Sequence, residues 1–249
     1  MKKNKMMRVA SVLLVAVLLT TSVISGTFAK YVTSTSTVAS ATVAKFGVTA
    51  SATGTLFNET YATDDTTVSA SDSDSISVSS TAKVVAPGTK NTTGLTFAFT
   101  GTPEVDVKIT FAIQAGSKDV FLKGTGLPDK TTSGAGTFDI TGEYHPIKFT
   151  LKNGATTVAT GTLSEIETAL ESKEFYVDAG TSLAADAYKY TLTWEWPFSD
   201  STNTAVGTNV DKADTLLGDL AVSAVDGVDA SNYSTEVSLT VVATVTQVD

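Results

Sequence analysis

Apolar and polar residues alternate at every second position in several parts of this chain, and this period most constrains the fold. The pattern is clearest from 188 to 198. Its apolar members are Tyr188, Tyr190, Leu192, Trp194, Trp196 and Phe198, and the polar residues between them are Lys189, Thr191, Thr193 and Glu195. A period of two is that of a β-strand with one face in a core. Large rings gathered on one face fill the space between two packed sheets, so the segment predicts a β-sandwich.

The same alternation recurs from Val105 to Ile113, where every second residue is a large apolar one. Shorter apolar or β-branched runs, bounded by turn residues, predict further strands. They are Ala44 to Ala50, Ile76 to Val84, Leu95 to Phe99, Phe138 to Ile140, Ile147 to Leu151, Phe175 to Val177 and Val237 to Val248. We therefore predict an all-β, antiparallel fold with few helices.

Two short helices and one turn interrupt this pattern. Ser164 and Glu167 have the spacing of a capping box, followed by apolar residues at helical spacing. A second helical stripe consists of Ala213, Leu216, Leu217 and Leu220. We expect both accessory helices to pack over a sheet edge or end. Pro87-Gly88 suits a type II turn that would make the Ile76 and Leu95 strands neighbours.

The first 29 residues have the pattern of an export signal. An uncharged apolar run extends from Val9 to about Ile24, and Thr27-Phe28-Ala29 places small residues near a cleavage point. The basic residues before the run are Lys2, Lys3, Lys5 and Arg8. Because the run is shorter than the roughly 20 apolar residues that span a bilayer, we predict a signal peptide that signal peptidase cuts between Ala29 and Lys30.

The composition of the remaining 220 residues limits which partners and ligands the protein can bind. They keep 13 basic and 26 acidic residues, a net charge of −13, which makes nucleic acid an unfavourable partner. The chain has no cysteine, so no disulfide stabilises it. The aspartates between Asn58 and Ser75 lack the spacing of a calcium loop. We predict no cofactor and no metal, and we interpret this segment as a surface loop.

The sequence offers few catalytic residues. His145 is the only histidine, which excludes a zinc site that needs two. Its neighbours Tyr144 and Pro146 indicate a corner where a strand begins. No nucleophile elbow or phosphate-binding glycine loop is present, and we expect Glu195 to face solvent. These observations predict a protein that is not an enzyme.

The order of these features resembles the TasA and camelysin family of exported firmicute proteins, which form biofilm matrix fibres. The resemblance rests on five segments: Gly26-Thr27-Phe28-Ala29, Ala41 to Val48 as a first core strand, Val85 to Thr89, Leu95 to Phe99, and Leu239 to Thr244. It implies a jelly-roll-like β-sandwich. It also implies assembly by donor-strand exchange, in which the freed N-terminal segment of one subunit completes a sheet of the next.

The mature N-terminus has the composition that such a donor strand needs. The predicted donor residues are Lys30, Tyr31, Val32, Thr33, Ser34, Thr35, Ser36, Thr37 and Val38. They favour strands and include no Gly or Pro. We therefore predict a signal peptide at 1–29, a donor segment at 30–42 and a β-sandwich domain at 43–249.

The resulting hypothesis is a secreted structural subunit of a head-to-tail homopolymer in the biofilm matrix or at the cell surface, with a minor fibre or anchoring subunit as a further possible partner. Two alternatives stay open. The first is a cell-surface adhesin or pilin-like binding protein. The second is a metalloprotease, because some camelysins have been described as such. A polar tail is the simplest alternative for residues 30 to 40.

Overall fold

A computed structural model describes residues 32–36, 41–43, 47–57, 60–63, 75–77, 84–132, 136–184, 186–200 and 203–248. At 32–36, 41–43, 60–63 and 75–77 the description covers the backbone alone. The described strands all belong to one compact unit, Val32–Asp249. The predicted signal peptide and cleavage site, with Lys30 and Tyr31, lie outside the described residues.

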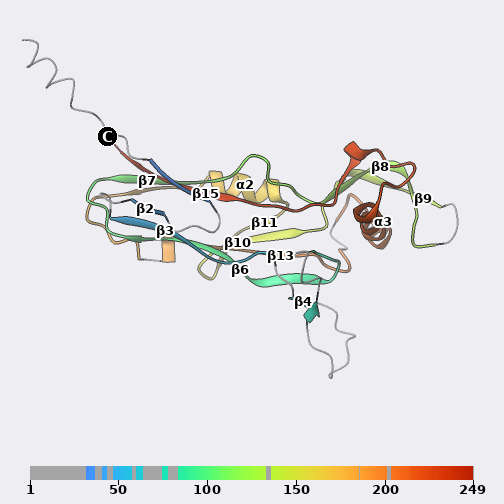
Figure 1. The fold of residues 1–249 in the computed structure, drawn as a ribbon, viewed down its shortest axis with the longest axis horizontal. Coiled ribbons are helices and arrows are strands. Elements are labelled where there is room, and N and C mark those ends of the chain that lie inside the picture. The colour runs from blue at the N-terminus through green and yellow to red at the C-terminus, as the bar shows by residue number, and fades with distance from the viewer. Residues whose placement is uncertain are drawn as a thin grey trace, which may run out of the picture. The chain divides into compact units, whose positions relative to one another are not determined.

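Two antiparallel sheets confirm the predicted all-β sandwich (Figure 1). The smaller sheet has the order β1 (Val32–Ser36), β15 (Val241–Gln247), β7 (Val107–Ile113) and β12 (Glu174–Val177). The larger sheet has the order β11 (Thr156–Gly161), β10 (Lys148–Asn153), β13 (Lys189–Glu195), β6 (Thr89–Gly101), β3 (Val48–Gly54) and β2 (Ala41–Val43). Beside β6, this sheet also includes β4 (Thr60–Thr63), which pairs with β5 (Ser75–Ser77). The jelly-roll connectivity stays a prediction.

Aromatic rings hold the two sheets face to face. Phe111 of β7 lies 5.5 Å from Phe97 of β6 and 5.3 Å from Tyr190 of β13, measured between ring centroids. Phe175 of β12 completes the cluster at 6.3 Å from Phe111. These are ordinary spacings for tilted and edge-to-face ring pairs. The alternating apolar residues of β7 and β13 therefore face each other across the interior, as their period predicts.

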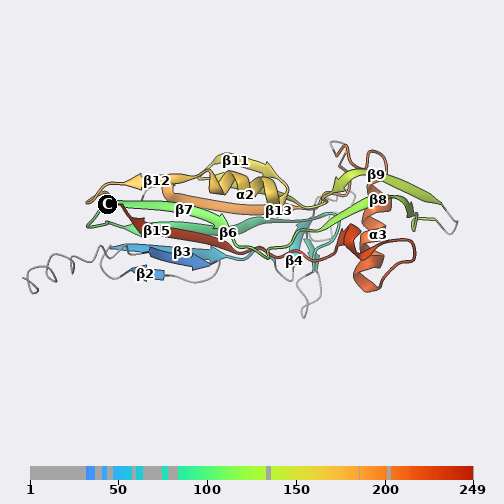
Figure 2. The ribbon, with the colours of Figure 1, turned by 90° about the horizontal axis from the view of Figure 1, so that it is seen from above.

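The sequence did not predict a third sheet, which has the order β14 (Tyr233–Ser234), β8 (Phe121–Pro128) and β9 (Thr137–Tyr144). Helix α3 (Val210–Val222) lies beside β8 (Figure 2). Its predicted apolar stripe is buried, which confirms its role as a packing helix. Two short 3-10 helices, η1 (Asp186–Tyr188) and η2 (Ala230–Asn232), complete the described elements.

Helix α2 (Leu163–Glu171) corrects the predicted capping box. The cap is Thr162 rather than Ser164, and its partner is Glu165 rather than Glu167. The Thr162 hydroxyl accepts the Glu165 N–H at 3.4 Å, while the Glu165 carboxylate accepts the Thr162 N–H at 2.8 Å. Both residue pairs have the same spacing. The earlier one starts the helix because it places Leu163 in the core.

The turn at Pro87-Gly88 is present, but its predicted consequence is wrong. The Thr89 N–H donates to the Ala86 carbonyl at 3.1 Å, and Gly88 has φ +81°, as a type II turn requires. Within the described residues, however, β4 rather than β5 pairs with β6. The strand from the Ile76 region is therefore one position further from β6 than predicted.

Two strand predictions also need correction at their ends. The strand expected at Ala44 to Ala50, and the first core strand expected at Ala41 to Val48, meet a turn at Gly47, where φ is +62°. That turn divides the segment into β2 and β3. At the other end of the aromatic strand, β13 stops at Glu195, and Phe198 is half-exposed instead of joining the buried face.

Candidate assembly site

The N-terminal strand β1 forms the outer edge of the smaller sheet, where it pairs with β15 (Figure 1, dark blue beside β15). The pairing is antiparallel over five residue pairs, from Val32 opposite Thr246 to Ser36 opposite Val242. Of the predicted donor segment 30–42, the structure thus describes Val32–Ser36 as this edge strand, and it places Ala41 and Thr42 in β2 of the larger sheet. Of the other predicted donor residues, Lys30, Tyr31, Thr37 and Val38 lie outside the described residues.

The hydrogen bonds of β15 alternate between its two neighbours. Just before the strand, Ser238 exchanges backbone hydrogen bonds with Lys118, at 2.9 and 2.8 Å, and the Gln114 N–H donates to the Thr240 carbonyl at 2.8 Å. Even-numbered residues of this run therefore bond toward β7, and odd-numbered residues bond toward β1. This alternation places Thr33 and Thr35 in the hydrogen-bonded pairs of the β1 edge, opposite Val245 and Ala243.

The side chains of β15 are apolar toward the core and more polar on the other face. Val241, Ala243 and Val245 are buried, whereas Thr244 and Thr246 are half-buried. The inner face belongs to the sandwich core. The backbone edge beyond it is the edge along which β1 pairs with β15.

Sequence reasoning missed this acceptor role, although it found the strand. The period-two pattern from Val237 to Val248 predicted a strand, but nothing in it says which strand is the neighbour. Pairing partners far apart in the sequence are set by the whole topology. β1 and β15 stand near opposite ends of the chain.

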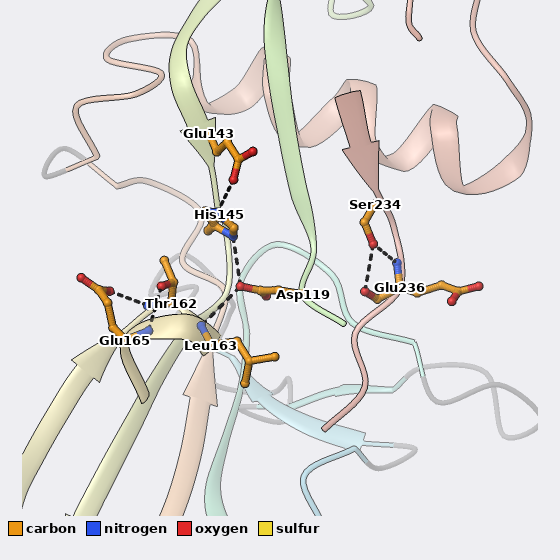
Figure 3. A network of polar contacts seen from close by, with 8 residues as sticks. All are labelled: Asp119, Glu143, His145, Thr162, Leu163, Glu165, Ser234 and Glu236. Carbon is orange, nitrogen blue, oxygen red and sulfur yellow. Dashed lines mark hydrogen bonds and ion pairs between the residues drawn. The ribbon is translucent and has the colours of Figure 1, made fainter. Parts of the chain in front are cut away.

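A second polar cluster surrounds the single histidine (Figure 3). His145 lies between β9 and β10, at the predicted strand corner. Its Nδ1 is 3.0 Å from Asp119 Oδ2, and its Nε2 is 3.5 Å from Glu143 Oε2. The same Asp119 oxygen accepts the Leu163 N–H of α2 at 3.4 Å. Two carboxylates thus contact one imidazole, and Asp119 also links it to the start of α2.

The hydrogen bond with Asp119 raises the pKa of His145, and Glu143 acts in the same direction, against the effect of burial. Lys123 contacts Glu143 at 2.7 Å and holds the pKa of that carboxyl below its usual range. Glu143 could be inferred from sequence, because it precedes His145 by only two residues. Asp119 could not, since it is 26 residues away.

A buried carboxyl joins α3 to β9. Asp214 accepts a hydrogen bond from the Tyr144 hydroxyl at 2.7 Å, and both side chains are almost fully buried. Burial raises the pKa of Asp214 to about 6 and also raises the pKa of Tyr144. Because Asp214 changes its charge near pH 6, the packing of α3 against β9 should be sensitive to pH.

No group of three or more His, Asp and Glu side chains in the described part of the chain could hold a metal ion. Among the same residues, no helix is long and apolar enough to cross a bilayer. No protein-family model matches the chain, and no curated protein or solved structure was found to be similar to it.

Proposed function

We propose that this protein is the exported structural subunit of an extracellular fibre, such as a biofilm matrix fibre, and that it polymerises by exchange of its N-terminal strand. The carrying observation is the position of β1. It is a short N-terminal strand at the very edge of a sheet, and its partner β15 offers a full backbone edge.

The strand that pairs with β15 can come from the same subunit or from a neighbouring one, and it forms the same ladder of hydrogen bonds in both cases. Release of β1 uncovers the β15 edge, which is a template for another extended segment. Because the donor and the acceptor are different surfaces of the same chain, each subunit can give one strand and accept one. Such a heterologous contact grows as a filament rather than closing as a dimer.

The composition of the edge fits exchange between identical chains. Val32–Ser36 and Val242–Thr246 contain no charged residue. The pairing therefore has no ion pair that would favour β1 of the same chain, and no like charges that would repel β1 of another copy. The aromatic cluster between the sheets can stay in place in either state, since its rings come from β6, β7, β12 and β13.

Cysteine pairing between different chains tests the exchange. Ser34 lies opposite Thr244 in a pair without mutual hydrogen bonds, where Cα atoms are about 4.5 Å apart, within disulfide range. One chain carrying S34C and another carrying T244C are mixed during assembly and then oxidised. The native chain has no cysteine to compete.

The proposal predicts a disulfide-linked ladder of the two variants that follows fibre growth. An S34C/T244C double variant, kept dilute and monomeric, serves as the control for pair geometry. Fibres that grow without any disulfide between the two variants, while the double variant closes its own, would refute strand exchange.

A further inference from the structure

A groove continues the acceptor surface beyond the N-terminal end of β15. It has a volume of about 460 Å³ and is lined by one face of α3 and by chain segments before and after that helix. Its lining residues are Val84 to Pro87, Val120, Trp196, Asp214, Leu217, Gly218, Ala221 and Thr235 to Ser238. The last four residues lie in the same extended run of chain as β15, so the groove and the acceptor edge are contiguous.

The extended run that ends with β15 is paired with other segments along one of its edges, but only part of its other edge is paired. From Tyr233 to Gln247 it pairs successively with β8, Lys118 and β7. On the opposite edge, among the described strands, β1 covers only Val242 to Thr246. Val237 and Leu239 bond toward that opposite edge by the alternation established above.

Exposed apolar side chains gather around the groove. Val84 lines it, and Val222 directly follows its lining residue Ala221 at the end of α3. Phe198 packs over Gly88, next to the lining residue Pro87. These three residues and Tyr176 are the large apolar side chains that stand exposed in the described part of the chain. Three out of four at one place indicate a surface for a partner.

We infer that the groove binds residues 37–43 of a second copy of this chain, the segment that directly follows β1. This inference rests on the proposed strand exchange. If the β1 register continues without a shift, Ser40 lies opposite Ser238 and Thr42 lies opposite Glu236. The sequence Thr-Val-Ala-Ser-Ala-Thr-Val has small and β-branched side chains and no charge. It suits a groove that is mostly apolar, in which Asp214 and Glu236 are the charged lining residues.

The donor can release this segment at small cost. Ala41–Val43 is the three-residue strand β2 at the outer edge of the larger sheet, paired only with β3 among the described strands. A short edge strand contributes few hydrogen bonds and can leave without opening the sandwich. The groove would thus lengthen the donated strand from five residues to about twelve, using the same ladder geometry.

Mixed cysteine variants test the register. S40C in one chain and S238C in another should form an interchain disulfide during assembly, as S34C and T244C do for β1. T235C replaces S238C as the matched control, because its position is three residues out of register with Ser40. Interchain disulfides of S40C with S238C and not with T235C support the inference.

The outcomes separate the two proposals. If S34C and T244C pair while S40C and S238C do not, strand exchange stands and the groove inference is overturned. If neither pair forms in fibres, both are overturned.

A groove-filling substitution gives a second measurement. Gly218 lines the groove on α3, and a Cβ built there has no atom within 4 Å. The G218L variant should therefore fold normally and fill the groove, whereas G218A should leave it open. We expect G218L to raise the critical concentration for fibre growth about tenfold or more, from the loss of roughly one buried side-chain contact, and G218A to leave it unchanged. Equal critical concentrations for G218L and wild type would overturn the inference.

Discussion

Strand β15 is bordered by two strands of different character. Its β7 edge makes seven residue pairs, and β7 supplies Val107, Ile109 and Phe111 to the core. Its β1 edge makes five pairs with Val32–Ser36 and carries no charge. The comparison separates two ways in which a strand is held. β7 is bound to the sandwich by its buried side chains as well as by its ladder. β1 has a shorter ladder of uncharged residues, and we propose that another copy can supply the same ladder.

The largest expected effect tests the β7 side. Phe111 is 3% exposed and contacts rings from three other strands. Phe111→Ala should lower the free energy of unfolding by about 3–5 kcal/mol, because it leaves a cavity between the sheets. Urea unfolding followed by tryptophan fluorescence measures it. A loss below about 1 kcal/mol would mean that the two sheets do not depend on this cluster.

The next effect concerns the α3 region, where Asp214 is buried beside Tyr144. Because the folded-state pKa of Asp214 is raised to about 6, protonation stabilises the fold at low pH, and this contribution is lost as pH rises from about 4 through 6. Asp214→Asn keeps an acceptor for Tyr144 without the charge. It should raise the free energy of unfolding by about 1–3 kcal/mol above pH 6.

Chemical denaturation of wild type and D214N at pH 4 and pH 7.5 tests this. The two proteins should be close in stability at pH 4 and differ at pH 7.5. The β1 edge contains no titratable group in Val32–Ser36 or Val242–Thr246, so the strand pairing itself should not share this pH dependence. A stability difference that stays constant over this range would contradict the assignment to Asp214.

A matched pair of prolines sharpens the view of the β1 edge. The Thr35 N–H faces β15, whereas the Ser34 N–H faces away from it, by the alternation of the ladder. Thr35→Pro removes one ladder hydrogen bond and should weaken strand addition by about 1–2 kcal/mol. Ser34→Pro should have less effect. Fibre critical concentrations compare the two, and equal values would show that the ladder does not have this alternation.

The smallest expected effect concerns His145. Its pKa is raised by Asp119 and Glu143, so the protonated ring stabilises the fold below about pH 6.5 and this contribution disappears as pH rises through the raised pKa. His145→Asn should cost about 1 kcal/mol at pH 5.5 and progressively less toward pH 9. Denaturation at both values checks it, and a cost that grows with pH would have the wrong sign.

Much of the sandwich could be predicted from local patterns. The strands β7 and β13 follow from their period of two, and the stripe of α3 follows from its period of three to four. Where two local signals competed, packing decided: Thr162 rather than Ser164 caps α2 because Leu163 must be buried. Strand β8 escaped prediction because glycines at 124 and 126 break its alternation, and Gly142 interrupts the pattern of β9 after the predicted Phe138 to Ile140.

Only the part of the candidate site that depends on local sequence could be predicted. The strand tendency of residues 30–38 is a local property. The acceptor edge on β15, the groove beside Gly218 and the contact of Asp119 with His145 each join residues distant in sequence. Only the folded arrangement brings them together.

Removal of the donor tests the central claim most directly. The chain that begins at Lys30 and a shortened chain that begins at Ala39 are purified and compared by negative-stain microscopy and sedimentation over the same concentrations. The account predicts fibres from the first, and a folded protein that stays monomeric from the second, because its β15 edge has no donor to accept. Fibres of unchanged form and abundance from the shortened chain would contradict it.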